Sequence, residues 1–355
     1  MRIGLLASVG HMVDSFFTEI IDTWIAAGHS VSVAAGTPTA DGTGVVIAGL
    51  GRRPGPGAVA AWAGLRRWAR SQRLDVVVTN SATASALVRT ARLPVPVVYF
   101  CHGLHWNSGT ALSDRVWQQV ERTLLRRTDG VIAINSDDHA WFGRRFDPQR
   151  LLRLPSGVGL DLERYRAGDP PQRLGDDDRL ELVWIGEFSE RKRPNRALDV
   201  VLALESLGVD VRLRMVGDGP LRSAVAERIR RLGLSGQVTA DGPDSVVDAL
   251  TRSHGLLHTS AWEGLPRVML EAVAVGRRPY AFDVKGVRDV PEAVLATDGD
   301  VAGLAAAIRS DWVSGRMTTP LVFDRTRLDY RLTGDAVRSF LEGLTDRRTA
   351  SQGVR

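Results

Sequence analysis

Two glutamates lie on either side of a Gly-Leu-Pro turn in the stretch AWEGLPRVMLEAVAVG, residues 261–276. Glu263 precedes a helix that Pro266 is suited to begin, and Glu271 lies inside that helix. The N-terminus of a helix offers unpaired N–H groups and the positive end of a dipole, which together favour phosphate. Carboxylates repel phosphate, and their natural partners are the hydroxyl groups of a diol. The pattern therefore predicts a ligand with sugar hydroxyls on both sides of a diphosphate, as in a nucleotide diphosphate sugar.

The length and composition limit the class of protein. A chain of 355 residues exceeds what one hydrophobic core usually supports, so two domains are expected. The net charge of +5 is mild, and there is no dense basic tract with interleaved aromatic residues, so nucleic acid is not an expected partner. No apolar run approaches the length of a membrane span, and the single cysteine, Cys101, rules out an internal disulfide. We therefore expect a cytoplasmic protein.

Strands and helices are expected to alternate along the chain. In each half, short runs rich in Val and Ile alternate with longer segments whose apolar residues have helical spacing. Such alternation predicts a parallel, doubly wound α/β sheet in each half. The strands expected in the first half are residues 1–9, 29–36, 74–80, 95–102 and 129–135, and those in the second half are residues 181–188, 211–219, 237–242, 254–260 and 277–284.

Two domains and a linker follow from this pattern. An N-terminal domain is expected over residues 1–165 and a C-terminal domain over residues 175–332, with the polar stretch 170–180 between them. A terminal helix over residues 333–347 is expected to pack back on the first domain. Ligands of such sheets bind at the carboxyl ends of the strands, so we expect the site there, in a cleft between the domains.

The spacing of Glu263 and Glu271, with seven residues between them, resembles the E-x7-E motif of the family-4 retaining glycosyltransferases. Those enzymes have the GT-B fold, in which two Rossmann-like doubly wound domains face each other across a cleft. The resemblance implies that Glu263 contacts hydroxyls of the donor sugar and that Glu271 contacts the ribose. It also implies that the backbone at Gly264, Leu265 and Pro266 approaches the sugar and the diphosphate. An ordinary amphipathic helix with solvated glutamates is the alternative interpretation.

A basic segment adds to this donor site. WIGEFSERKRP, residues 184–194, resembles the family's G-R-x4-K-G segment, whose arginine and lysine neutralise the diphosphate. Lys192 matches the lysine, although the chain contains only two lysines among its 46 basic residues. Glu187 stands where the family has the arginine, so Arg191 and Arg193 are the candidates to replace that positive charge. A solvated surface lysine is the alternative interpretation of Lys192.

Two turns resemble the family's nucleotide pocket. Gly217, in the segment MVGDGPLR, matches a turn that borders the base pocket. Gly242, Pro243 and Asp244 match the loop whose backbone usually reads the nucleobase. The resemblance therefore assigns all four residues to donor binding, with UDP as the expected nucleotide.

The strongest match in the first half is YFCHGLHWNSG, residues 99–109. It resembles the strand end H-G-x-H-aromatic of the capsule- and exopolysaccharide-type members of the family. The resemblance implies that His102 lies near the donor sugar. The residues that it assigns to catalysis are then His102, Lys192 and Glu263. A structural histidine at the end of a strand is the alternative interpretation of His102.

The acceptor side is expected in loops of the first half. The same resemblance places His105 and Trp106 there, and the first loop adds Gly10 and His11. Lipid-linked acceptors are common in the family, and the basic helix expected over residues 61–74 carries its apolar residues along one face. Peripheral contact of this helix with the inner membrane face, and packing of the helix on its own sheet, both stay open.

These motifs predict a retaining glycosyltransferase that moves a hexose-type sugar from a nucleotide diphosphate donor to a hydroxyl acceptor, which is a glycan, a lipid-linked molecule or a small molecule. No Asp-x-Asp pair lies where it would hold a metal between phosphates, and no zinc-type spacing occurs, so neither a metal nor a cofactor is expected. A non-catalytic glycosyltransferase-like partner subunit or sugar-nucleotide binding protein is the alternative, which Glu187 favours. A nucleotide-sugar epimerase of the same fold is a lesser alternative.

Overall fold

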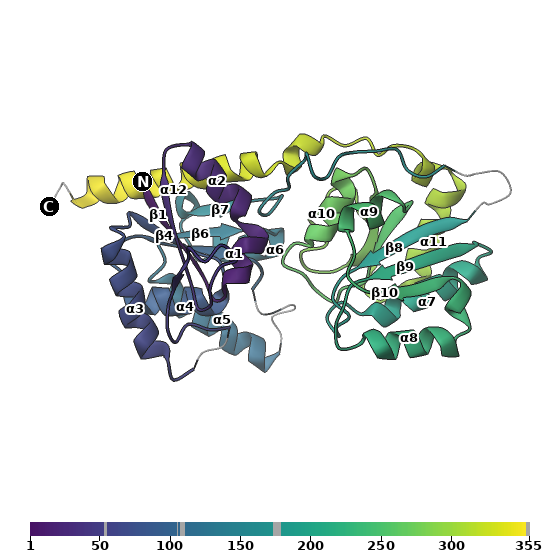
Figure 1. Cartoon of the computed structure of the whole chain (residues 1–355), viewed down its shortest axis with the longest axis horizontal. Coiled ribbons are helices and arrows are strands. Elements are labelled where there is room, and N and C mark those ends of the chain that lie inside the picture. The colour runs from purple at the N-terminus through teal and green to yellow at the C-terminus, as the bar shows by residue number, and fades with distance from the viewer. Residues whose placement is uncertain (53–54, 105, 107–110, 173–178, 353–355) are drawn as a thin grey trace. The chain divides into compact units, whose positions relative to one another are not determined.

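The chain forms two compact units in a computed structural model, which describes residues 1–52, 55–104, 106, 111–172 and 179–352 (Figure 1). The first unit contains Met1–Gly159 together with Asp329–Arg355, and the second contains Leu160–Leu328. The division falls at Gly159, whereas the sequence pattern placed the end of the first domain at residue 165. Each unit has its own parallel sheet and its own hydrophobic core.

A seven-stranded parallel sheet forms the centre of the first unit, in the spatial order β3-β2-β1-β4-β5-β6-β7. The order reverses direction between β1 and β4, which is the switch point of a doubly wound sheet. β4, β5 and β6 are continuous buried runs, as expected for a parallel sheet covered on both faces. The strands are β1 (Arg2–Ala7), β2 (Ser30–Ala35), β3 (Val45–Val46), β4 (Val76–Thr79), β5 (Val97–Cys101), β6 (Gly130–Ala133) and β7 (Leu151–Arg153).

Helix α3 packs on its own sheet. Its residues Leu65 and Trp68 are buried, and Trp68 Nε1 donates a 2.9 Å hydrogen bond to Ser32 Oγ on β2. The apolar face of this helix is therefore not available to a membrane. The helices of the first unit are α1 (Gly10–Phe16), α2 (Thr18–Ala26), α3 (Ala58–Ser71), α4 (Ala82–Ala91), α5 (Leu112–Leu125), α6 (Ser136–Gly143), the short 3-10 helix η1 (Pro148–Arg150) and α12 (Tyr330–Gln352).

The C-terminal helix α12 is part of the first unit and lies along α2 (Figure 1). Trp24 Nε1 on α2 donates a 3.0 Å hydrogen bond to the carbonyl of Gly334. A Cβ atom at Gly130, on β6, would lie 2.6 Å from Leu344 Cδ1, so the strand and the helix meet without room for a side chain. The helix expected over residues 333–347 thus forms and covers the first sheet.

The second unit is built on a six-stranded parallel sheet in the order β10-β9-β8-β11-β12-β13, which reverses direction between β8 and β11. Its strands are β8 (Leu180–Ile185), β9 (Val211–Val216), β10 (Val238–Asp241), β11 (Gly255–His258), β12 (Arg278–Asp283) and β13 (Val294–Thr297). Its α-helices are α7 (Pro194–Ser206), α8 (Arg222–Arg231), α9 (Val246–Thr251), α10 (Arg267–Ala274) and α11 (Val301–Val313). The carboxyl ends of β8 and β11 lie side by side at the switch point, where ligands of such sheets bind.

Candidate functional site

The loops that follow β8 and β11 are held together at the switch point of the second sheet. Trp184 Nε1 donates to Thr259 Oγ1 at 3.0 Å, and Thr259 Oγ1 donates to the carbonyl of Lys192 at 2.9 Å. The backbone N–H of Ala261 donates to the carbonyl of Arg191 at 2.8 Å. These bonds fix the segment around Lys192 against the segment that carries Glu263.

Glu263 is the centre of a cluster of polar side chains. Lys192 Nζ lies 2.6 Å from its Oε1, and Arg191 Nη1 lies 2.6 Å from its Oε2. Ser260 Oγ donates a 2.7 Å hydrogen bond to Oε1. Burial favours the neutral acid, but contact with His258 and the charges of Lys192 and Arg191 outweigh it and hold the pKa of Glu263 well below its usual range. Glu263 is therefore a buried carboxylate that stays ionised, with a cation on each oxygen.

His258 ends β11 and closes the buried side of this cluster. Its Nε2 lies 3.5 Å from Glu263 Oε1, at the outer limit of a hydrogen bond. Burial lowers the pKa of His258, so its imidazole is neutral at pH 7. The sequence motifs did not indicate a role for His258 or Ser260, although both belong to the strand end and turn that lead into Glu263.

Glu271 lies on α10 and is also buried, with 6% of its surface exposed. The Tyr165 hydroxyl donates a 2.7 Å hydrogen bond to its Oε1, and Arg267 Nε donates to the same oxygen at 3.1 Å. Within the described residues, no such contact is made to Oε2. One oxygen of this carboxylate is thus engaged by the protein, and the other remains available for a ligand.

The two arginines that could replace the positive charge missing at Glu187 have different partners in the structure. Glu187 is exposed, and its side chain makes no ion pair with any residue that the structure describes. Arg191 lies on Glu263, whereas Arg193 Nη1 lies 2.6 Å from Asp298 Oδ1. Arg193 is the N-cap of α7 and has a left-handed backbone, with φ of 48°. Of the two, only Arg191 joins Lys192 at the carboxylate.

Gly217 is required by the close approach of two loops. Its φ is +141°, and a Cβ atom there would lie 2.0 Å from the carbonyl oxygen of Gly186. The N–H of Gly186 donates to the carbonyl of Val216 at 3.0 Å, and the N–H of Phe188 donates to the carbonyl of Asp218 at 2.8 Å. The turn after β9 therefore sets the position of the loop after β8, which carries the basic segment.

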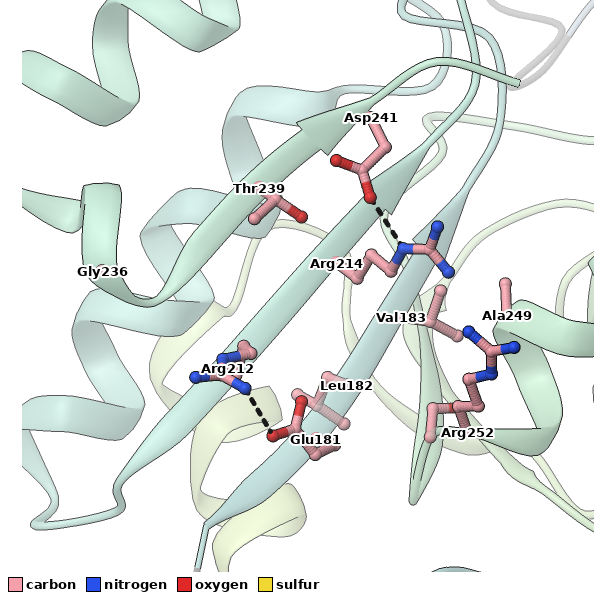
Figure 2. Close-up of a pocket in the computed structure, with 11 residues that line it drawn as sticks. Glu181, Leu182, Val183, Arg212, Arg214, Gly236, Thr239, Asp241, Ala249 and Arg252 are labelled. Atoms are coloured by element: carbon pink, nitrogen blue, oxygen red, sulfur yellow. Dashed lines mark hydrogen bonds and ion pairs between the residues drawn. The ribbon is translucent and has the colours of Figure 1, made fainter. Parts of the chain in front are cut away.

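The loop with Gly242, Pro243 and Asp244 follows β10 and is tied down by Arg214 on β9. Arg214 Nε donates to Asp241 Oδ2 at 2.7 Å, as Figure 2 shows, and Arg214 Nη2 donates to Asp244 Oδ2 at 2.6 Å. The hydrogen bond from Arg214 lowers the pKa of Asp244. Asp244 therefore anchors the loop through its side chain.

A hollow of about 480 Å³ lies beside this loop, over β8, β9 and β10 (Figure 2). The charged residues on its strands pair with one another: Arg214 with Asp241, and Arg212 with Glu181 at 3.5 Å, while Arg252 lies beside them at the end of α9. The charges of the strands are thus largely balanced by one another. Such pairs are typical of a solvated sheet face, and they do not single out a ligand.

The turn from Glu263 to Pro266 packs against Gly286, where there is no room for a side chain. A Cβ atom at Gly286 would lie 2.4 Å from the carbonyl oxygen of Glu263 and 2.5 Å from that of Gly264. Leu265 packs against the core of the unit. Pro266 is buried and is the N-cap of α10, so the helix begins one residue later than the sequence pattern placed it.

In the first unit, His102 follows β5 among three phenylalanines. Its ring stacks on Phe100 with centroids 4.8 Å apart, and the rings of Phe17 and Phe16 lie 5.8 and 6.0 Å away. The residue is only partly buried, but its Nε2 is enclosed and has no hydrogen-bond partner. Burial lowers the pKa of His102 to about 4, so the imidazole is neutral at pH 7.

The residues expected on the acceptor side have different surroundings. Gly10 is packed so closely that a Cβ atom would lie 2.0 Å from the carbonyl oxygen of Pro38. His11 is exposed on α1. Trp106 is buried against Trp141, with ring centroids 5.1 Å apart, and so belongs to the core. His105 lies outside the described residues.

In the described part of the chain, no group of three or more His, Cys, Asp or Glu side chains is arranged to hold a metal ion. None of the helices described is long and apolar enough to span a membrane.

Family models match both units. The model described as a glycosyl transferase 4-like domain matches residues 13–157, and the model described as glycosyl transferases group 1 matches residues 179–310. EpsD of Bacillus subtilis (strain 168), whose name assigns it to the glycosyltransferases, is 26% identical over 271 residues, which cover 71% of each chain. The alpha-D-kanosaminyltransferase of Streptomyces kanamyceticus is 26% identical over 215 residues, which cover 56% of each chain.

Solved structures share the fold. HepE of Anabaena, in complex with UDP, has a TM-score of 0.71 at 20% identity, with all of both chains covered. WaaG, a glycosyltransferase involved in lipopolysaccharide biosynthesis, has a TM-score of 0.65 at 17% identity, with 97% of this chain and 98% of that chain covered. From the two family models and this fold, we conclude that the chain belongs to the group 1 glycosyltransferases and has the two-domain GT-B fold.

Proposed function

We propose that the protein is a retaining glycosyltransferase that transfers a hexose-type sugar from a UDP-linked donor to a hydroxyl acceptor without a metal ion. The observation that carries the proposal is the buried Glu263 carboxylate with Lys192 on one oxygen and Arg191 on the other. This cluster lies at the carboxyl ends of β8 and β11, where ligands of doubly wound sheets bind. HepE has been solved with UDP and with UDP-glucose, which supports a uracil nucleotide for a protein of the same fold.

The two cations supply positive charge for the leaving diphosphate. Lys192 and Arg191 each have N–H groups beyond those donated to Glu263, so each can bind a phosphate oxygen as well. When the bond between the anomeric carbon and the diphosphate oxygen breaks, negative charge grows on the diphosphate. Cations that are already fixed in place stabilise that charge without reorganisation, which is why the proposed reaction needs no metal.

Glu263 acts as a binding group in this mechanism. Its pKa is held low despite burial, so the carboxylate does not exchange a proton near neutral pH. The acceptor hydroxyl attacks the face of the anomeric carbon from which the diphosphate departs. The new carbon–oxygen bond forms as the old one breaks, and the leaving phosphate oxygen takes the proton of the acceptor. Attack on that face retains the anomeric configuration.

The carboxylate of Glu271 and the imidazole of His102 are also suited to bind the donor. Glu271 has one oxygen held by Tyr165 and Arg267, so its Oε2 is placed to accept a hydrogen bond from a ribose hydroxyl. The imidazole of His102 is partly exposed and neutral, so it suits a hydrogen bond to a sugar hydroxyl and not an ion pair.

The first experiment is a thermal-shift screen of the purified chain against UDP, GDP, ADP and dTDP, each with and without EDTA. A ligand that binds only the folded state raises the melting temperature by mass action. We expect stabilisation by UDP that is insensitive to EDTA and is lost in Glu271→Ala. A transfer assay with UDP-glucose then reports the anomeric configuration of the product by NMR. Absence of any nucleotide effect at millimolar concentration, or an inverted product, would overturn the proposal.

We also propose that α5 makes a peripheral contact with the inner membrane face. This contact would bring the site to a lipid-linked acceptor. Four apolar side chains of this helix are exposed: Leu112, Val116, Trp117 and Val120, with exposed fractions of 78%, 56%, 45% and 40%. Exposed arginines flank them, and an apolar stripe beside arginines suits an anionic lipid surface. Co-flotation with phosphatidylglycerol vesicles should be lost in Val116→Asp/Val120→Asp, and unchanged flotation of that variant would refute this contact.

The exposed carboxylate of Glu187 favours one alternative, a non-catalytic sugar-nucleotide binding protein. A carboxylate near the diphosphate opposes its binding, whereas the family has an arginine at this position. The variant Glu187→Arg separates the two functions. Tighter UDP binding together with measurable transfer only in the variant would indicate a degraded enzyme, and transfer by the unaltered chain would exclude the alternative.

A further inference from the structure

A second hollow, of about 550 Å³, lies entirely within the first unit, and half of the residues that line it are arginines. We call it the arginine hollow. Its arginines are Arg89, Arg92, Arg126, Arg127, Arg150 and Arg348.

The arginine hollow and His102 lie at opposite ends of the strands of the first sheet. Val97 begins β5, Asp129 precedes β6, and Arg150 precedes β7, so the lining gathers at the amino ends of these strands. His102 follows the carboxyl end of β5. Because the strands are parallel, the hollow is separated from His102 by the full length of β5. Its chemistry is therefore independent of the proposed transfer site.

The positive charge of the hollow is not balanced by its own lining. Six arginines face one aspartate. Arg89 is neutralised by the buried Glu121, with Nη1 to Oε1 at 2.5 Å and Nη2 to Oε2 at 3.1 Å. Asp129 Oδ2 accepts a 2.8 Å hydrogen bond from the backbone N–H of Val97. Within the lining, one carboxylate is thus left for the other five arginines, whereas the arginines on the strands of the hollow in Figure 2 are each paired with a carboxylate.

Two of these arginines are held in position by backbone carbonyls. Arg150 donates to the carbonyl of Asp129 at 2.5 Å and also to the carbonyl of Thr128, and its guanidinium lies over the Phe146 ring, 4.8 Å from the centroid. Arg348 Nη2 donates to the carbonyl of Pro94 at 2.9 Å. A carbonyl partner fixes a guanidinium without cancelling its charge, so Arg150 keeps its positive charge at the rim.

The other three arginines have no such anchor. Arg92, Arg126 and Arg127 are exposed, and their side chains form no ion pair or hydrogen bond with any residue in the described part of the chain. The positive field extends to the neighbouring surface, where burial and the charges of Arg122 and Arg144 lower the pKa of Arg145. Gathering unpaired like charges around one hollow is unfavourable unless an anion joins them.

We propose that the arginine hollow binds a multiply charged phosphate anion, either a phosphomonoester or a diphosphate. The guanidinium group is planar and always charged, and it matches two phosphate oxygens at once. Arg150 forms a fixed floor for the anion, and Arg92 and Arg127 reach it from the residues that follow α4 and α5. The anion comes either from solution or from the headgroup of a lipid, since both present the same phosphate oxygens.

Isothermal titration of the full chain with inorganic pyrophosphate tests the proposal. Arg92→Gln/Arg127→Gln removes two of the unanchored guanidiniums, and we expect binding to weaken by at least about tenfold. Arg67→Gln/Arg70→Gln is the matched control, because these arginines of α3 are also exposed and lie outside the hollow. The control should bind within about twofold of the unaltered chain. Equal melting temperatures without ligand establish that each variant is folded.

Pyrophosphate can also occupy the proposed donor site, which Lys192→Met distinguishes. Binding that persists in Lys192→Met and is lost in Arg92→Gln/Arg127→Gln supports the arginine hollow. Binding lost in Lys192→Met but kept in the hollow variant overturns it, as does equal weakening in the α3 control. Co-flotation with phosphatidylglycerol but not phosphatidylcholine vesicles, lost in the hollow variant, identifies a lipid headgroup. Pyrophosphate binding together with flotation that the hollow variant leaves unchanged, as contact through α5 alone would give, identifies a free anion. A chain that binds neither refutes the proposal.

Discussion

Two neighbouring arginines provide the sharpest test of the proposed donor site. Arg191 lies on the buried Glu263, and Arg193, two residues along, lies on the exposed Asp298. The variants Arg191→Met and Arg193→Met remove the same charge from the same loop and keep a similar side-chain length. Only the first should weaken donor binding, because only Arg191 joins Lys192 at the carboxylate.

The expected size of the effect follows from the exposure of the two side chains. A hydrogen bond to a charged group contributes about 1.5–3 kcal/mol. The Arg191 side chain is 33% exposed, so solvent screening favours the lower part of this range, about 1.5–2 kcal/mol. This corresponds to a loss of roughly 10- to 30-fold in donor affinity. The pair of Arg193 and Asp298 is an exposed surface pair, and its loss should change donor affinity by less than about threefold.

The assay is titration of UDP into each purified variant, followed by kcat/KM with UDP-glucose. Arg191→Lys serves as the control that keeps the charge and should recover part of the affinity. Equal losses in Arg191→Met and Arg193→Met would mean that the loop responds only to its net charge. Undiminished affinity in Arg191→Met would mean that Lys192 alone neutralises the diphosphate. Either result would refute the assignment of Arg191.

The remaining predictions concern stability. Gly217→Ala should destabilise by about 3 kcal/mol or more, because its Cβ atom would meet a backbone carbonyl at 2.0 Å, whereas Gly236→Ala, with nothing within 4 Å, should be close to neutral in thermal melts. Arg89→Met should cost about 3–5 kcal/mol in urea unfolding, since it leaves Glu121 buried and unpaired, and adding Glu121→Leu should recover most of the loss. Burial lowers the pKa of His102 to about 4, so the unfolded chain binds its proton first and stability falls as the pH drops from 6.5 to 4. Between pH 7 and 5 the free energy of unfolding should fall by about 2 kcal/mol, and this fall should be absent from Asn or Gln variants of His102. The same dependence of stability on pH in His102→Gln would contradict the prediction.

The alternation of strands and helices in the sequence was enough to predict two parallel doubly wound sheets. Parallel strands are buried on both faces, so they appear as short continuous runs such as VVYFC at β5. The association of Lys192 with Glu263 could also be predicted, because segments that follow β8 and β11 meet at the point where the strand order reverses. The functional roles of these residues stay predictions.

Other contacts could not be predicted, because they depend on backbone geometry and on distant partners. Arg193 turns away from Arg191 through a left-handed residue at the start of α7, which nothing in the residue types indicates. Trp106 packs on Trp141 of α6, a contact that the residue types alone do not indicate, and its place on the acceptor side stays a prediction. Tyr165 and Glu271 are 106 residues apart, and no local pattern links them.

The position of α12 has a consequence for how the chain is made. The hydrogen bond from Trp24 to Gly334 joins residues 310 apart, so the first unit lacks α12 until the chain has been translated past Tyr330. At typical ribosomal rates, the surface of α2 that α12 covers is exposed for roughly 15–60 s. The second unit is continuous in sequence and can finish folding first, although it is translated later. The first unit therefore stays incomplete while the second unit is made, and the helix that completes it is translated after both sheets.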